Sequence, residues 1–138
     1  MSQTLDSEEK IKVKILDKQS KFCKLFTNTH RLQILNVLME EIPNSLIEEL
    51  QIPKKIRKEL TVSQILEAIK KEFGTDLSQT ALSQHLSILR TNGAVITRRD
   101  GNNIYYMIAN PKLMITCSVV REIVMDVLRN EQVLLTEK

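Results

Sequence analysis

The stretch Leu77–Ile108, LSQTALSQHLSILRTNGAVITRRDGNNIYYMI, predicts a helix, a sharp stop and a two-stranded hairpin. Ser78 is a typical N-cap, because its hydroxyl can accept a hydrogen bond from an unpaired amide of the first turn. Gly93 can take the left-handed conformation that ends a helix. Between them, apolar residues recur at helical spacing and give one buried face, namely Ala81, Leu82, Leu86 and Leu89. We therefore expect a helix over residues 77–92.

A hairpin is predicted directly after this helix. Two segments with extended character, Val95–Arg99 and Asn102–Ile108, flank the dipeptide Asp100-Gly101. That dipeptide suits the positive φ angles of a tight hairpin turn. We expect a basic wing over residues 94–108.

The predicted helix carries polar side chains off its apolar face, of the types that can read the edges of DNA bases. These candidates are Ser78 at the helix start and then Gln79, Thr80, Ser83, Gln84 and His85. Basic side chains that can contact DNA phosphates lie just beyond them, at Arg90, Arg98 and Arg99. A helix that reads bases, followed by a wing that contacts phosphates, is the winged helix-turn-helix arrangement. The alternative is an ordinary exposed helix face.

This region closely resembles the recognition helix and wing of the ArsR/SmtB family of bacterial transcription repressors. The matching residues are Leu77–Leu86, then Leu89, Arg90 and Gly93, then Arg98–Gly101, and Tyr105 with Tyr106. A second run, Thr29–Leu35, resembles the family's second helix, and the likeness covers roughly residues 22–128. The resemblance implies a mainly α-helical fold with a small β-hairpin and a homodimer formed by the first and last helices. It also implies a repressor that binds double-stranded DNA at an inverted repeat.

The other segments complete one domain over residues 1–138. Residues 1–6 are expected to be loose, with a long first helix beginning at the cap Ser7. Two further helices are expected, each with a threonine cap. One begins at the cap Thr29, and the other spans Val62–Phe73 after the cap Thr61.

An insertion over residues 42–58, IPNSLIEELQIPKKIRK, separates the second and third helices. Asn44 or Ser45 could cap a short helix that ends at Leu50. The basic run Lys54–Lys58 is expected to be a solvated connector. An additional contact to DNA phosphate or to a partner is the alternative.

A last helix is predicted over residues 110–130, since Asn110 is an N-cap and Pro111 suits the first helical position. Its apolar residues recur at near-heptad spacing, at Leu113, Cys117, Val120, Val124 and Val127. This stripe is too apolar for a free surface helix. We therefore expect it to form a dimer contact together with the first helix.

The composition favours a soluble, cytoplasmic protein that is not an enzyme. The chain of 138 residues has a net charge of +3, which is compatible with DNA binding without proving it. It has no apolar leader at its N-terminus, and no apolar run approaches the roughly 20 residues that span a bilayer, so no membrane partner is expected. With three glycines, it offers no phosphate-cradling loop, and no nucleophile and base stand at a recognisable spacing. We expect no cofactor.

Metal sensing is not expected either. Many members of the family bind metal through a Cys-x-Cys pair in the third helix, where this chain has Thr61 and Ser63. Neutral hydroxyls are poor ligands for soft metals. Another family site takes Asp, His and Glu from the last helix, which here offers Glu122 and Asp126 but no His.

The two cysteines, Cys23 and Cys117, lie on the predicted first and last helices, and both should be reduced in the cytoplasm. Some family members sense oxidants or persulfides through a cysteine pair, so one interpretation is a thiol switch. Against it, the second-helix cysteine of such relatives is Asn36 here, and Cys117 lies near the start of the last helix. The other interpretation is that both cysteines pack as small hydrophobic residues.

A second class of function is a winged-helix module that binds another protein, partly through the insertion, and does not read DNA. The polar helix face and the arginines of the wing favour DNA. The sequence patterns do not identify the operator, the regulated genes or an effector.

Overall fold

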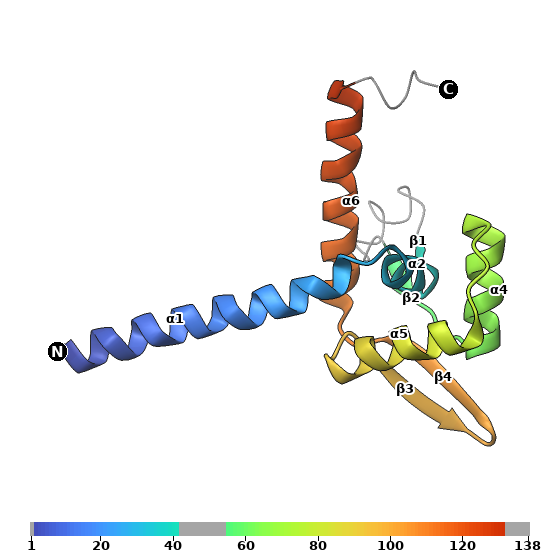
Figure 1. The fold of residues 1–138 in the computed structure, drawn as a ribbon, viewed down its shortest axis with the longest axis horizontal. Coiled ribbons are helices and arrows are strands. Elements are labelled where there is room, and N and C mark those ends of the chain that lie inside the picture. Colours follow the sequence, from blue (N-terminus) through green and yellow to red (C-terminus); the bar gives the residue numbers. More distant parts are fainter. Residues whose placement is uncertain (1, 42–54, 132–138) are drawn as a thin grey trace, which may run out of the picture.

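Three helices form the body of the fold in the computed structural model, which describes residues 2–41 and 55–131. They are α2 (Thr29–Val37), α4 (Val62–Phe73) and α5 (Gln79–Thr91). Two long helices extend from this body in different directions (Figure 1), namely α1 (Ser2–Cys23) and α6 (Pro111–Glu131). A short 3-10 helix, η1 (Lys24–Phe26), connects α1 to α2. The expected mainly helical fold with a small hairpin is confirmed.

Side-chain caps determine where α4 and α5 begin. The Thr61 hydroxyl accepts a hydrogen bond from the Gln64 amide at 3.3 Å, and the Gln64 side chain accepts one from the Thr61 amide at 2.9 Å. This reciprocal pair is a capping box. The Ser78 hydroxyl caps α5 by accepting from the Ala81 amide at 3.0 Å. Both predicted helix starts are confirmed.

The start of α2 differs from the prediction. The cap is Asn28 rather than Thr29, and its Oδ1 accepts from the Arg31 amide at 3.1 Å. The Arg31 guanidinium then donates to the carbonyls of Leu25 at 2.9 Å and Lys24 at 3.2 Å. These bonds attach the first turn of α2 to η1.

The core lies where α2, α4 and α5 meet. The side chains that are 0 to 1 % exposed on these helices are Ile34, Leu35, Ile65, Ile69, Leu82, Leu86 and Leu89. Burial of a side chain of this size contributes about 1.5–3 kcal/mol to stability. The predicted buried face of α5 is confirmed, with Ala81 partly buried at its edge. Because this face is turned inward, the residues on the opposite side of α5 point outward.

The wing is an antiparallel pair formed by β3 (Val95–Asp100) and β4 (Asn103–Ile108). The expected hairpin is confirmed, but its turn lies one residue later than predicted. Asp100 pairs with Asn103, so the turn is Gly101-Asn102, and Gly101 takes a φ of 60°. Leu60 and Tyr106 exchange backbone hydrogen bonds of 3.0 and 2.8 Å, which attach the segment before α4 to the wing.

Two predictions about the first half of the chain are wrong. The first helix, α1, begins at Ser2 and not at Ser7, so residues 2–6 are helical and not loose. Part of the basic run forms β2 (Lys55–Arg57), which pairs antiparallel with β1 (Met39–Glu41) rather than serving as a plain connector. The expected short helix ending at Leu50 lies outside the described residues.

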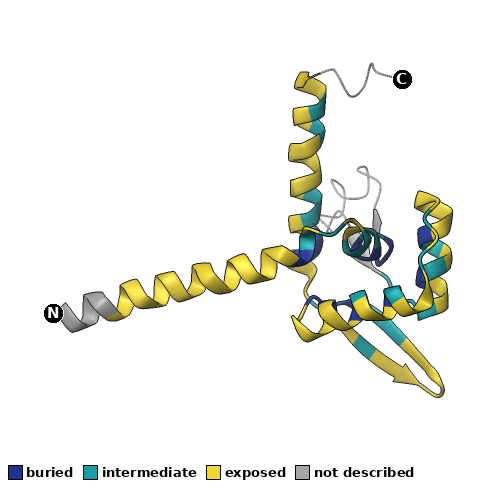
Figure 2. Ribbon diagram, in the orientation of Figure 1, coloured by how far each residue is buried: buried dark blue, intermediate teal, exposed yellow. Residues whose placement is uncertain are grey.

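The long helices are the most exposed parts of the fold (Figure 2). Residues 7–23 of α1 are all exposed, including the large apolar side chains of Ile11 and Ile15. Most of α6 beyond Met114 is exposed or half-buried. In the described part of the chain, no helix is long and apolar enough to cross a membrane.

Candidate nucleic-acid interface

The outer face of α5 gathers four uncharged polar side chains. Gln79, Thr80, Ser83 and Gln84 are all exposed, whereas Leu82 beside them is fully buried. The Ser78 cap orients the first turn, so the free backbone amides of that turn also point outward from the helix start. The structure thus brings together four of the predicted base-reading residues on one accessible face.

His85 is placed differently from these four residues. Its ring is partly buried and packs edge to face against His30 of α2, with 5.7 Å between ring centroids. Its Nδ1 is buried and has no hydrogen-bond partner within the described chain. Burial, then the charge of Arg31, then His30 lower the pKa of His85 below its ordinary value of 6.5. His85 therefore joins α5 to α2 rather than lying on the open polar face.

Arg90 lies at the C-terminal turn of α5, at the edge of an open hollow beside the wing. The hollow is lined by Ser83, Leu86, Ser87, Arg90, Thr91 and Tyr106. Hydroxyl and guanidinium groups of this kind donate hydrogen bonds to phosphate oxygens. Arg90 is exposed and forms no ion pair among residues 2–41 and 55–131.

The two wing arginines have different surroundings. Arg98 donates from Nη2 to Oε2 of Glu59 at 2.8 Å, and its guanidinium carbon lies 4.7 Å from the centroid of the Tyr105 ring. The hydrogen bond to Glu59 raises the pKa of Arg98 above its ordinary value, so this guanidinium stays charged. Arg99 is exposed near the tip of the hairpin, where its Nε donates to the carbonyl of Gly101 at 3.4 Å.

The sequence analysis did not identify the contact between Glu59 and Arg98. The two residues are separated by 39 positions, and Glu59 belongs to no helix or strand. The pairing of Leu60 with Tyr106 brings Glu59 beside the wing. No local pattern in the sequence indicates that pairing.

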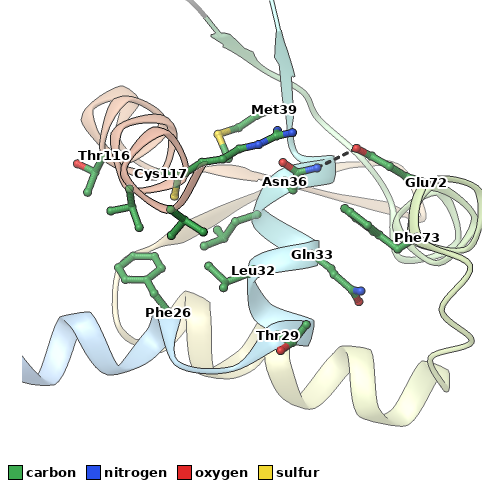
Figure 3. Close-up of a pocket in the computed structure, with 14 residues that line it drawn as sticks. Phe26, Thr29, Leu32, Gln33, Asn36, Met39, Glu72, Phe73, Thr116 and Cys117 are labelled. Carbon is green, nitrogen blue, oxygen red and sulfur yellow. Dashed lines mark hydrogen bonds between the residues drawn. The ribbon is translucent and has the colours of Figure 1, made fainter. Parts of the chain in front are cut away.

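An apolar groove of about 510 Å³ lies between α2, α6 and the end of α4 (Figure 3). Its lining includes Phe26, Leu32, Phe73, Cys117, Val120 and Val124. Leu32 of α2 faces this groove and is 43 % exposed. At one end, the Asn36 amide donates to the Glu72 carboxylate at 2.9 Å.

The two cysteines lie in different environments. Cys117 is half-buried and packs against the apolar core, while Cys23 is exposed at the end of α1. Neither cysteine forms a disulfide in this structure. In the described residues, no three His, Cys, Asp or Glu side chains gather in a way that could hold a metal ion.

The predicted apolar stripe of α6 is largely open to solvent. Val120, Val124 and Val127 are 54, 50 and 47 % exposed, and Ile123 beside them is 57 % exposed. Only Leu113, at the start of the stripe, is buried in the core. A continuous row of exposed aliphatic side chains is typical of a protein–protein contact.

Comparisons with known proteins extend this description. No family model matches the chain. The uncharacterized HTH-type transcriptional regulator Rv0081 of Mycobacterium tuberculosis is 38% identical over 61 residues, which cover 44% of this chain and 54% of that protein. The transcriptional activator HlyU of Vibrio cholerae is 30% identical over 90 residues, which cover 65% of this chain and 62% of HlyU. The matches thus span between about half and two-thirds of these relatives.

Solved structures resemble most of the chain. The crystal structure of Rv0081 superposes with a TM-score of 0.62 at 26% identity, covering 85% of this chain and 95% of that one. The solution structure of Mb0332 from Mycobacterium bovis, a possible ArsR-family transcriptional regulator, has a TM-score of 0.63 at 26% identity. It covers 86% of this chain and 89% of that one, and it is a homodimeric winged helix-turn-helix DNA-binding domain. The names of these relatives describe them as regulators of transcription.

Proposed function

We propose that this chain, which has the winged helix-turn-helix fold of transcription regulators, binds double-stranded DNA in a sequence-specific manner and is not an enzyme. One observation supports this most strongly. The helix α5 buries its leucines in the core and presents four exposed, uncharged polar side chains beside a hairpin that carries two arginines. That combination suits a helix in the major groove and a wing along the DNA backbone.

Base reading is assigned to the exposed face of α5. Gln79 and Gln84 can each bridge N6 and N7 of an adenine, and the Thr80 methyl can contact a thymine methyl. Ser83 can donate to or accept from either base of a pair. His85 has a supporting role, because its ring is engaged with His30.

Phosphate contacts are assigned to Arg90, Arg99 and the amides at the start of α5 after Ser78. Arg98 belongs to the same surface, but it is held by Glu59 and Tyr105. Phosphate contacts position the protein on the duplex and make its affinity depend on salt.

The working unit is a homodimer formed through α1 and α6, whose apolar side chains are exposed in the single chain. A dimer with two-fold symmetry would place two α5 helices in successive major grooves, so the DNA site is an inverted repeat. The homodimer of Mb0332 supports this arrangement by analogy.

Membership of the ArsR/SmtB family, a cytoplasmic location and a role as repressor are parts of the same proposal. They rest on the resemblance in α5 and the wing. HlyU is an activator, so the direction of regulation must be measured with a promoter fused to a reporter. Thr61 caps α4 through its hydroxyl, which fits a chain that has no metal site at this position.

The thiol switch is a further part of the proposal that needs its own test. A mild two-electron oxidant should convert the Cys23 and Cys117 thiols to a disulfide, with release of two protons, and lower the affinity for DNA; mass spectrometry detects the disulfide. Cys23→Ser should abolish the response to oxidation. If oxidation leaves the affinity unchanged, the chain has no thiol switch that controls DNA binding, and Cys117 serves to pack against the edge of the core.

Amide NMR spectra recorded during titration with duplex DNA test the DNA-binding function. We expect the signals of α5 and the wing to shift and those of the outer half of α6 to stay in place. If no signals shift, the chain does not bind the duplex, which is the outcome that the alternative of a protein-interaction module requires.

A further inference from the structure

Glu59 and Arg98 form an ion pair on the proposed DNA-binding surface. Nε and Nη2 of Arg98 both donate to Oε2 of Glu59, at 3.2 and 2.8 Å. The guanidinium also lies 4.7 Å from the centroid of the Tyr105 ring, within the range of a cation–π interaction. Arg98 is thus held from two sides by groups of its own chain.

The backbone around these three residues makes the arrangement specific. Arg98 and Tyr105 face each other in the register of β3 and β4. Leu60 exchanges hydrogen bonds of 3.0 and 2.8 Å with Tyr106, which places the preceding residue, Glu59, beside the same hairpin. The carboxylate, the guanidinium and the ring therefore come from three neighbouring extended segments.

We propose that Glu59 competes with DNA phosphate for Arg98 and thereby limits how tightly the wing binds DNA. This inference rests on the proposed DNA binding. Glu59 thereby sets how strongly Arg98 contacts a DNA phosphate. The positions of the wing arginines alone do not indicate this role.

The exposure of the pair allows such a competition. The side chains of Arg98 and Glu59 are 46 and 42 % exposed, so a DNA phosphate and water can both reach them. An ion pair between such accessible groups is weak, and a phosphate forms a similar charge-assisted bond with arginine. While Glu59 holds Arg98, the pair is neutral and displaces fewer counterions from DNA than a free arginine would. Arg90 has no such carboxylate within the described chain.

The substitution Glu59→Gln tests the proposal, because it removes the charge and keeps the size of the side chain. Affinity for one fixed duplex is measured by fluorescence anisotropy over a series of salt concentrations. We expect an affinity about two- to fivefold higher than that of the native chain. The slope of log affinity against log salt should become steeper by about 0.9, the value of one added phosphate contact.

Arg98→Ala and the double variant separate release of Arg98 from a general change in charge. If Glu59 acts through Arg98, Glu59→Gln has no effect on affinity in the Arg98→Ala background. Glu67→Gln, on the exposed side of α4, removes the same charge and should change the affinity much less. Thermal unfolding confirms that each variant is folded.

Four results would overturn the proposal: lower affinity in Glu59→Gln, unchanged affinity in Glu59→Gln, an equal gain in Glu67→Gln, or a gain that persists without Arg98. Lower affinity would mean that Glu59 orients Arg98 toward DNA. Unchanged affinity in Glu59→Gln, with clear binding by the native chain, overturns this inference alone. If neither chain binds the duplex, the proposed function fails as well.

Discussion

The imidazole rings of His30 on α2 and His85 on α5 meet edge to face, with 5.7 Å between their centroids. This contact joins the helix that carries the base-reading face to the helix packed behind it. His85 Nδ1 is buried there without a hydrogen-bond partner in the described residues, and Arg31 contributes a positive charge nearby. The neutral ring is therefore the form that the fold favours.

The first prediction concerns the pH dependence of stability. Because the fold lowers the pKa of His85 below 6.5, the unfolded chain binds a proton more readily than the folded chain between the two pKa values. The contribution of neutral His85 to the free energy of unfolding is complete above the pKa that His85 has in the unfolded chain. It is lost as the pH falls through the lower pKa of His85 in the folded chain. His85→Gln should thus reduce the free energy of unfolding at neutral pH by about 0.5–1.5 kcal/mol, the usual contribution of a ring pair.

Chemical unfolding of both chains across this pH range checks the prediction. The difference in stability between the native chain and His85→Gln should shrink as the solution becomes acidic. Two curves that stay parallel over the whole range would show that protonation of His85 is not linked to folding.

A second prediction concerns base reading by Gln84, which is exposed in the middle of α5. Gln84→Ala should weaken binding to the operator by about 1–3 kcal/mol, the contribution of one bidentate base contact. Binding to unrelated duplexes should barely change, because phosphate contacts are kept. Competition binding with operator and scrambled DNA measures both effects.

Gln19→Ala is the matched control for Gln84→Ala. Gln19 is exposed on α1, outside the base-reading face, so its removal should change neither kind of binding in a variant that sedimentation shows to be dimeric. If Gln84→Ala weakens binding to operator and scrambled DNA equally, Gln84 does not read bases.

A third prediction concerns the dimer. Val124 is 50 % exposed in the apolar stripe of α6, and a charge buried in a contact between helices is costly. Val124→Asp should convert the dimer to a monomer in sedimentation experiments and leave the circular dichroism of the fold nearly unchanged. It should also weaken binding to an inverted repeat far more than binding to a single half-site.

The control on the same helix is Asn130→Asp, which adds the same charge at an exposed polar position. That variant should remain dimeric. A native chain that sediments as a monomer at all concentrations would contradict the assignment of α1 and α6 to the dimer.

Local signals predicted the part of the fold that carries the site. The Ser78 and Thr61 caps lie within three residues of the groups that they bond, and the leucines of α5 repeat at helical spacing. The Gly101 turn connects neighbouring strands, so the hairpin could also be predicted. Interactions of this kind depend on nearby residues, which is why they can be recognised in a single sequence.

Pairings between distant segments were missed. β1, just before the insertion, pairs with β2 near the end of the insertion, and the short strand of Lys55–Arg57 has no alternating pattern long enough to predict it. The contact between Glu59 and Arg98 spans 39 positions. The partly buried ring of His85 depends on where α2 packs against α5, which helical periodicity alone does not determine.

The most direct test of the central claim compares two duplexes of equal length, one from upstream of the gene for this chain and one with the same bases scrambled. We expect binding that weakens steeply with salt and favours the upstream duplex by about a thousandfold or more, as specific regulators do. Equal affinity for both duplexes, or no salt-dependent binding to either, would contradict the claim that α5 reads DNA sequence.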